Sequence, residues 1–108
     1  MRYDSLVRDI KYYVSTHLNE NLSVKALAER GYMSVTNFSR VFKQQTGISP
    51  YEYVLISRLN KAKELLRQTD MSISQIAAAV GFNSDSNFIH FFSQNTGISP
   101  KSFRKLEF

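Results

Sequence analysis

The sequence predicts an all-α protein of about seven helices in which one structural unit is written twice. Apolar residues recur at spacings of three and four along most of the 108 residues, which is the period of a helix, and no segment reads as a strand. The pentapeptide TGISP occurs at 46–50 and again at 96–100. Residues 22–50 align with 71–100, first at an offset of 49 and, after one extra residue near 83–86, at an offset of 50. The chain therefore contains an internal helical repeat.

An amphipathic helix is predicted at the start of the chain, over 4–18. Its apolar side is expected to hold Leu6, Ile10, Tyr13 or Val14, and His17 or Leu18. We expect His17 to be a residue of the helix end.

Each copy of the repeat is predicted to form two short helices with a turn between them. Ser23 and Ser34 precede apolar runs at helical spacing, so each hydroxyl can accept a hydrogen bond from a first-turn N–H. In the second copy, Ser72 takes the first role, and Ser84 or Asp85 takes the second. The second helix of each copy has an apolar side, expected to hold Phe38 and Val41 or Phe42 in the first copy and Phe88 and Phe91 or Phe92 in the second.

The TGISP segment is predicted to end one helix and begin the next. Gly47 stands where a left-handed residue commonly ends a helix, and Ile48 can fold back as the apolar contact of that end. Ser49 can cap the following helix, and Pro50 fits its first position, where no N–H is needed. The same assignments hold for the second copy of the pentapeptide at 96–100.

A long helix is predicted between the copies, over 50–69, and a short last helix from Pro100 through Phe103 toward Leu106. The long helix would span about 28 Å. Its apolar stripe is expected to hold Tyr51, Val54, Leu55, Arg58, Leu59, Ala62, Leu65 and Leu66. Arg58, Lys61, Lys63 and Arg67 lie mostly off that stripe and are expected to face solvent. A single domain over 1–108 would then comprise 4–49, the linker helix 50–69, and 70–108.

Composition excludes several classes of site. The chain has no cysteine, which excludes disulfides and thiolate ligands and fits a reducing cytoplasm. Its two histidines, His17 and His90, make a poor metal set, and we find no nucleophile–base pair, carboxylate pair or phosphate loop, so neither an enzyme nor a cofactor is expected. No apolar run approaches the length of a membrane span. A net charge of +5 favours an anionic partner such as nucleic acid.

Two short helices with a polar outer face match the plan of a helix-turn-helix. In the first copy that face carries Thr36, Ser39, Arg40 and Lys43, and in the second Ser86, Ile89, His90 and Ser93. Hydroxyls and an arginine without acids suit a major groove, where arginine can contact guanine or phosphate in bidentate fashion. The second face has no Lys or Arg, and Ile89 could pack on a thymine methyl or be buried against a neighbour. A single such pair is commonly an ordinary αα-hairpin, but the duplication on a basic chain favours DNA binding.

The repeat resembles the DNA-binding domain of the AraC/XylS family of bacterial transcription regulators, over about residues 4–107. The segments that carry the resemblance are 28–34, 38–43, 46–50 with Tyr53, 76–82, 86–88, Phe92, and 96–100 with Phe103-Arg104. The family implies two helix-turn-helix subdomains, recognition helices at about 34–45 and 85–95, and phosphate contacts by backbone amides near Ser23, Ser72 and Pro100. The residues predicted to contact double-stranded DNA are Ser34, Thr36, Asn37, Ser39, Arg40, Lys43, Ser84, Ser86, Asn87, Ile89, His90, Ser93 and Lys101. Lys101, Arg104 and Lys105 form a basic end, open to phosphate contact or to solubility alone.

The sequence departs from the family pattern at Tyr32, His90 and Ser93. Tyr32 replaces a turn glycine, with Gly31 one place earlier, which predicts an adjusted turn. His90 and Ser93 replace an arginine and a lysine, so we expect the first recognition helix to dominate binding. The tandem units should read an asymmetric site of about 20 base pairs in successive major-groove segments about 34 Å apart, and a slightly short linker helix predicts bent DNA or a shallow second contact.

The resemblance implies a cytoplasmic regulator of transcription, an activator by expectation, with RNA polymerase as a possible protein partner and no membrane association. Family members usually carry a sensing or dimerisation domain ahead of this one, and we expect such a domain to be missing from the chain. The competing hypothesis is an all-α protein–protein interaction module that does not read DNA.

Overall fold

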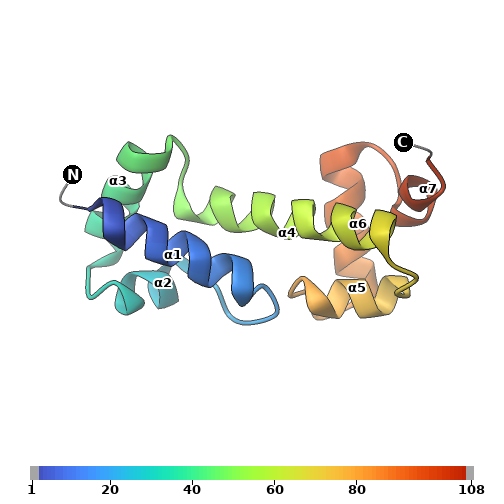
Figure 1. Cartoon of the computed structure of the whole chain (residues 1–108), viewed down its shortest axis with the longest axis horizontal. Helices are drawn as coiled ribbons and strands as arrows, with labels where there is room; N and C mark the ends of the chain where they lie inside the picture. Colours follow the sequence, from blue (N-terminus) through green and yellow to red (C-terminus); the bar gives the residue numbers. More distant parts are fainter. Residues whose placement is uncertain (1–2, 107–108) are drawn as a thin grey trace. The chain divides into compact units, whose positions relative to one another are not determined.

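The computed structural model describes residues 3–106 and forms seven α-helices and no strand within that range. The helices are α1 (Asp4–Thr16), α2 (Val24–Arg30), α3 (Val35–Thr46), α4 (Pro50–Gln68), α5 (Ile73–Ala79), α6 (Asp85–Thr96) and α7 (Pro100–Arg104) (Figure 1). The predicted all-α fold and its order of helices are confirmed, with boundaries that differ by one or two residues. None of these helices is long and apolar enough to cross a membrane.

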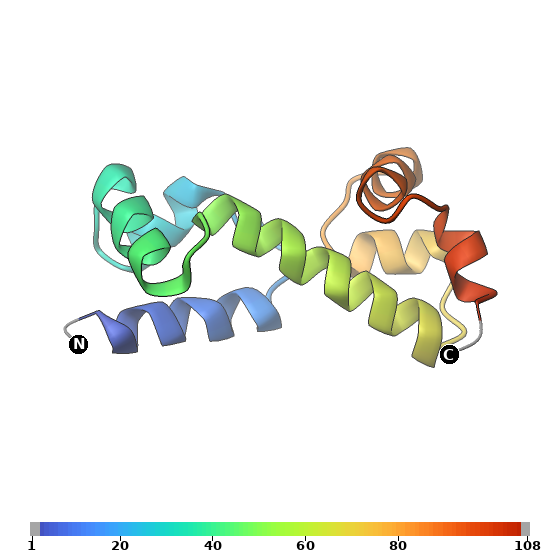
Figure 2. The same ribbon diagram turned by 90° about the horizontal axis from the view of Figure 1, so that it is seen from above.

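The chain divides into two compact units, with the division between Ser57 and Arg58. The division falls inside α4, which is one continuous helix (Figure 2). Each unit therefore uses its own part of α4, and each has its own core.

The first core is built from α1, α2, α3 and the start of α4. Where the sequence left alternatives open, the structure buries Val14 and Leu18, leaves Tyr13 half-buried, and buries both Val41 and Phe42. Its buried members are Val7, Ile10, Val14, Leu18, Leu22, Leu27, Ala28, Phe38, Val41, Phe42 and Val54.

The second core repeats this plan with the end of α4 in the role that α1 has in the first. Leu59, Ala62 and Leu66 of α4 follow the spacing of Val7, Ile10 and Val14 in α1. Its buried members are Ala62, Leu66, Ile76, Ala77, Val80, Phe88, Phe92 and Phe103. The repeated unit is thus three helices and the first turn of a fourth, longer than the sequence alignment showed. The alignment stopped short because the loop after α1 is longer than the loop after α4.

The same ring packing occurs in both cores. Phe42 meets Tyr53 edge-on at 5.5 Å between ring centroids, and Phe92 meets Phe103 in the same way at 5.3 Å. The pairs Phe38–Phe42 and Phe88–Phe92 are tilted at 5.7 and 5.9 Å. These contacts lock the second helix of each copy against the helix that follows it.

Both TGISP segments form the predicted helix end and helix start. Gly47 and Gly97 are left-handed, with φ of 86° and 83°. Ser49 and Ser99 accept hydrogen bonds from the third residue of the next helix, and both prolines are buried at its first position. The threonine, which the sequence left unexplained, bonds across the turn: Thr46 Oγ1 lies 2.8 Å from Phe42 O and 3.0 Å from Ile48 O. Thr96 makes the same contacts in the second copy.

The turn of the first copy is not adjusted, contrary to the prediction. Tyr32 has φ of 56° and occupies the position of Gly81, whose φ is 92°. The hydrogen bond that closes the turn is also the same, from Met33 N to Ala28 O at 3.0 Å and from Phe82 N to Ala77 O at 2.9 Å. Gly31 cannot take over this role because its φ is −88°. Tyr32 thus holds a left-handed conformation that residues other than glycine disfavour.

The structure corrects three assignments in the linker helix. Tyr51 was placed in the apolar stripe but is 63% exposed, and Tyr53 packs on the first core instead. Tyr51 lies in the first turn of α4, and its counterpart in the first turn of α7, Lys101, is also exposed. Arg58, which the sequence placed both in the apolar stripe and among the solvent-facing cations, is half-buried, as is Lys63. Burial lowers the pKa of the Arg58 guanidinium from the ordinary value.

Candidate nucleic-acid interface

The α3 helix presents a cationic, hydroxyl-bearing face opposite its core side. Phe38, Val41 and Phe42 anchor it in the core, while Thr36, Arg40 and Lys43 are exposed and Asn37 and Ser39 are half-buried. Ser34 caps the helix by accepting a hydrogen bond from Asn37 N at 3.2 Å. The structure thus brings the six residues predicted in the first copy to the start and outer side of one helix.

On this face Arg40 donates hydrogen bonds to two amide side chains. Its Nη2 donates to Asn37 Oδ1 at 2.5 Å, and its Nη1 donates to Gln44 Oε1 at 3.4 Å. Asn37 precedes Arg40 by three positions and Gln44 follows it by four, so all three lie on one side of the helix. Sequence reasoning included Asn37 but missed Gln44, which the i, i+4 spacing could have indicated.

The α6 helix presents the corresponding face without a Lys or Arg. Ser86, Asn87 and His90 are exposed, Ser93 is half-buried, and Ile89 is 39% exposed, which excludes burial of Ile89 within its unit. Phe88 and Phe92 are fully buried, and Phe91 is half-buried with its ring 4.9 Å from that of Phe82. Phe88 and Phe92 therefore belong to the core and are not available as a stacking platform for bases, while Phe91 packs against Phe82.

Ser84, not Asp85, caps α6, by accepting a hydrogen bond from Asn87 N at 3.1 Å. The Asp85 carboxylate instead accepts a hydrogen bond from Ser74 Oγ, which links the start of α6 to α5. Asp85 corresponds to Val35 in α3, which carries no charge. The two faces therefore differ by two cations on α3 and one acid in the first turn of α6.

The basic end of the chain has mixed roles. Lys101 is exposed on α7, where it was predicted to contact DNA. Arg104 instead donates from Nε to Leu66 O at 3.1 Å and from Nη2 to Thr69 O at 3.2 Å. It therefore binds carbonyl groups at the end of α4, which lack intrahelical partners. This structural role answers the question that sequence left open for Arg104, and only a tertiary contact could show it.

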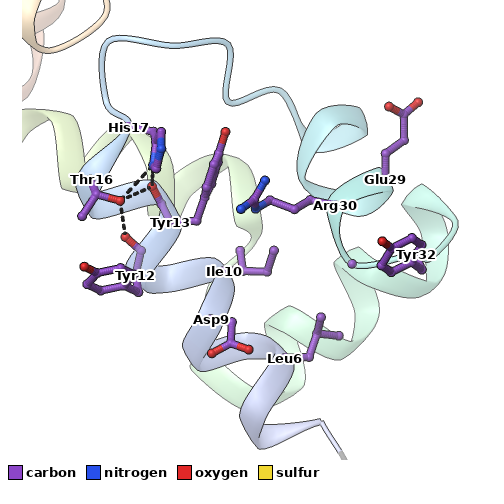
Figure 3. Close-up of a pocket in the computed structure, with 11 residues that line it drawn as sticks. Leu6, Asp9, Ile10, Tyr12, Tyr13, Thr16, His17, Glu29, Arg30 and Tyr32 are labelled. Carbon is purple, nitrogen blue, oxygen red and sulfur yellow. Dashed lines mark hydrogen bonds between the residues drawn. The ribbon is translucent and has the colours of Figure 1, made fainter.

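A hollow of about 750 Å³ lies between α1 and α2 (Figure 3). On its wall the Tyr13 ring stacks on His17 at 3.9 Å, and the Arg30 guanidinium lies 3.6 Å from the Tyr13 centroid. His17 is the C-terminal cap of α1, as predicted. The hollow is lined by none of the residues predicted to contact DNA. In the described part of the chain, no group of three or more His, Asp or Glu side chains is arranged to hold a metal ion.

Comparison with known proteins identifies the family. A family model described as a helix-turn-helix domain matches residues 27–106. A solved transcriptional regulator from Chromobacterium violaceum, described as having an AraC-type DNA-binding domain, is 33% identical, with a TM-score of 0.80 over 93% of this chain and 89% of that one. The chain belongs to the AraC-type helix-turn-helix family. The resemblance seen in the sequence is confirmed.

Two further similar proteins bear on function. The transcriptional activator RhaS of Escherichia fergusonii is 35% identical over 78 residues, which are 72% of this chain and 28% of RhaS. The DNA-binding domain of AdpA, solved in complex with a target DNA, is 32% identical, with a TM-score of 0.84 over 91% of this chain and 88% of that one. The chain spans less than a third of the length of the curated relatives it matches.

Proposed function

We propose that this chain binds double-stranded DNA in a sequence-specific manner and forms the DNA-binding part of a bacterial transcription activator. The observation that carries the proposal is the outer face of α3, where Thr36, Ser39, Arg40 and Lys43 lie opposite a fully apolar side. Arginine and lysine neutralise phosphates, and arginine and hydroxyls hydrogen-bond to base edges. The similarity to AdpA, whose domain was solved on DNA, supports the same role.

The first unit supplies most of the affinity in this proposal. Two cations on α3 face a phosphate backbone, whereas α6 offers His90 and hydroxyls and carries Asp85 in its first turn. Each phosphate that a cation neutralises releases counterions, which strengthens binding. The α6 helix then contributes to binding through its fit to the groove and through an apolar contact, in which Ile89 meets a thymine methyl.

The bound site is an asymmetric stretch of about 20 base pairs, because units repeated in tandem along one chain are not related by a two-fold axis. Footprinting with a single chain tests this point. Protection of two unlike half-sites in successive major-groove segments is expected. A perfect palindrome that requires two chains would contradict it.

A salt titration separates this function from the competing one, a protein–protein interaction module. Affinity for a duplex should fall steeply as salt rises, with a slope of about −0.9 per phosphate contact in a plot of log K against log salt concentration. A flat response on both random and selected duplexes would reject DNA binding.

The finer assignments follow from the same proposal. The chain would act in the cytoplasm, would have RNA polymerase as a protein partner, and would have no enzymatic activity. A sensing or dimerisation domain would accompany it in a longer polypeptide, as expected from relatives of which the matched segment is less than a third. Purification of the native polypeptide and measurement of its mass test this last point directly.

A further inference from the structure

Among the cations on the proposed recognition face, Arg40 is the one whose side chain is held by hydrogen bonds. Both of its terminal nitrogens are engaged, Nη2 by Asn37 Oδ1 and Nη1 by Gln44 Oε1. Its partners are neutral amides, so they orient the guanidinium without cancelling its charge. Lys43, on the same face, carries a single ammonium group and has no planar pair of donors to orient.

These two bonds leave the guanidinium able to bind a base. A guanidinium has five N–H donors, two on each terminal nitrogen, so one hydrogen on each of these nitrogens stays available. A bidentate contact to the O6 and N7 acceptors of guanine needs one hydrogen from each of two nitrogens. An arginine held in one orientation before binding also loses less conformational freedom when it docks.

We propose that Asn37 and Gln44 are positioning residues that orient the Arg40 guanidinium and thereby set its preference for guanine at one position of the site. This inference rests on the proposed function and deepens it. Arg40 contacts the base and the amides act through Arg40, so the DNA contact that the sequence predicts for Asn37 becomes an indirect one. Gln44 thereby becomes a determinant of specificity although it makes no base contact of its own.

The second unit contains a matched control. Asn87 and Gln94 stand at the positions equivalent to Asn37 and Gln44, with His90 in place of Arg40. No hydrogen bond joins His90 to either amide in the described part of the chain. An imidazole is also too short to span from one amide to the other along the helix. The same amides are therefore present on α6 without the cation that they would orient.

The test compares alanine variants on a set of duplexes that differ at each base pair of the selected site in turn. Arg40→Ala should lower the preference for its cognate base pair by about tenfold or more. Asn37→Ala and Gln44→Ala should each lower the preference at that same position by about three- to tenfold, and leave the salt slope unchanged because no phosphate contact is lost. The matched control Gln94→Ala should leave the preference at that position unchanged.

A double-mutant cycle gives the readout that a merely structural role would not move. In the Arg40→Ala background, Asn37→Ala and Gln44→Ala should have no further effect on base preference. A further loss in that background would mean that the amides contact DNA themselves, and it would overturn the inference. An unchanged base preference in both Asn37→Ala and Gln44→Ala would also overturn the inference. Gln44 is exposed, so its variant retains the fold and decides the question even where Asn37→Ala weakens folding.

Failure of this inference is distinguishable from failure of the proposed function. A wild-type chain that binds duplexes without any sequence preference, or does not bind them, contradicts the proposed function. A wild-type chain that selects a guanine through Arg40, with selectivity indifferent to Asn37 and Gln44, contradicts the positioning role alone.

Discussion

The two units share a scaffold and differ in the surface that it presents. Both have serine-capped helices, a left-handed turn residue, a TGISP segment and an edge-on ring pair between the last two helices. The two cations on the outer face of α3 are not repeated on α6, since Arg40 corresponds to His90 and Lys43 to Ser93. Side chains that hold the fold are thus repeated, whereas side chains that would meet a partner have diverged.

The largest expected effect tests the shared scaffold. Phe38→Ala and Phe88→Ala each remove a fully buried ring, so each should destabilise its own unit by about 3–5 kcal/mol. Denaturant unfolding followed by circular dichroism measures the free energy of unfolding. Losses of equal size in the two variants are expected, and a large loss in only one would show that the cores are not equivalent.

The divergent faces are compared by Arg40→Ala and His90→Ala. The first should weaken specific DNA binding by about 1–3 kcal/mol, while the second should cost less because the outer face of α6 carries no Lys or Arg. Fluorescence anisotropy on the selected duplex measures both affinities. Equal losses would contradict the dominance of the first unit. The gain-of-charge variant His90→Arg should tighten binding, and no gain would argue that α6 lies too far from the phosphates.

Arg104 is expected to act on stability and not on DNA. Arg104→Ala removes two hydrogen bonds from a charged donor to carbonyls at the end of α4, which should cost about 1.5–3 kcal/mol. Lys101→Ala is the control, since this residue is exposed and should change stability little while reducing the salt slope of DNA binding. The reverse pattern would exchange the roles of the two residues.

The smallest expected effect concerns the turn. Tyr32→Gly should stabilise the first unit by up to about 1 kcal/mol, because glycine adopts the left-handed conformation without steric cost. Gly81→Ala should destabilise the second unit by a similar amount for the same reason. Thermal unfolding detects both changes. A destabilised Tyr32→Gly variant would mean that the exposed tyrosine ring makes a stabilising contact.

Most of the fold could be predicted because its signals are local. Serine caps, the glycine and proline of TGISP and apolar spacing act within a few residues, and they located all seven helices of the described chain. The errors concern long-range contacts. Tyr51 and Tyr53 are two residues apart, and the position of Phe42 decides which is buried. The role of Arg104 depends on carbonyls 35 and 38 positions earlier in the chain.

The candidate site could be predicted in composition but not in organisation. The polar faces of α3 and α6 follow from the burial of Phe38, Phe42, Phe88 and Phe92 on the opposite sides. The orientation of Arg40 does not follow, because an arginine on a helix can turn toward either neighbouring turn. The structure adds that Asn37 and Gln44 engage it from both sides.

Selection of duplexes from a random pool by a single chain tests the central claim most directly, namely that a duplicated scaffold carries two unequal recognition surfaces. The account predicts an asymmetric consensus, with strong base preference in the half bound by α3 and weak preference in the half bound by α6. Two equally defined half-sites, a palindrome, or no enrichment at all would contradict it.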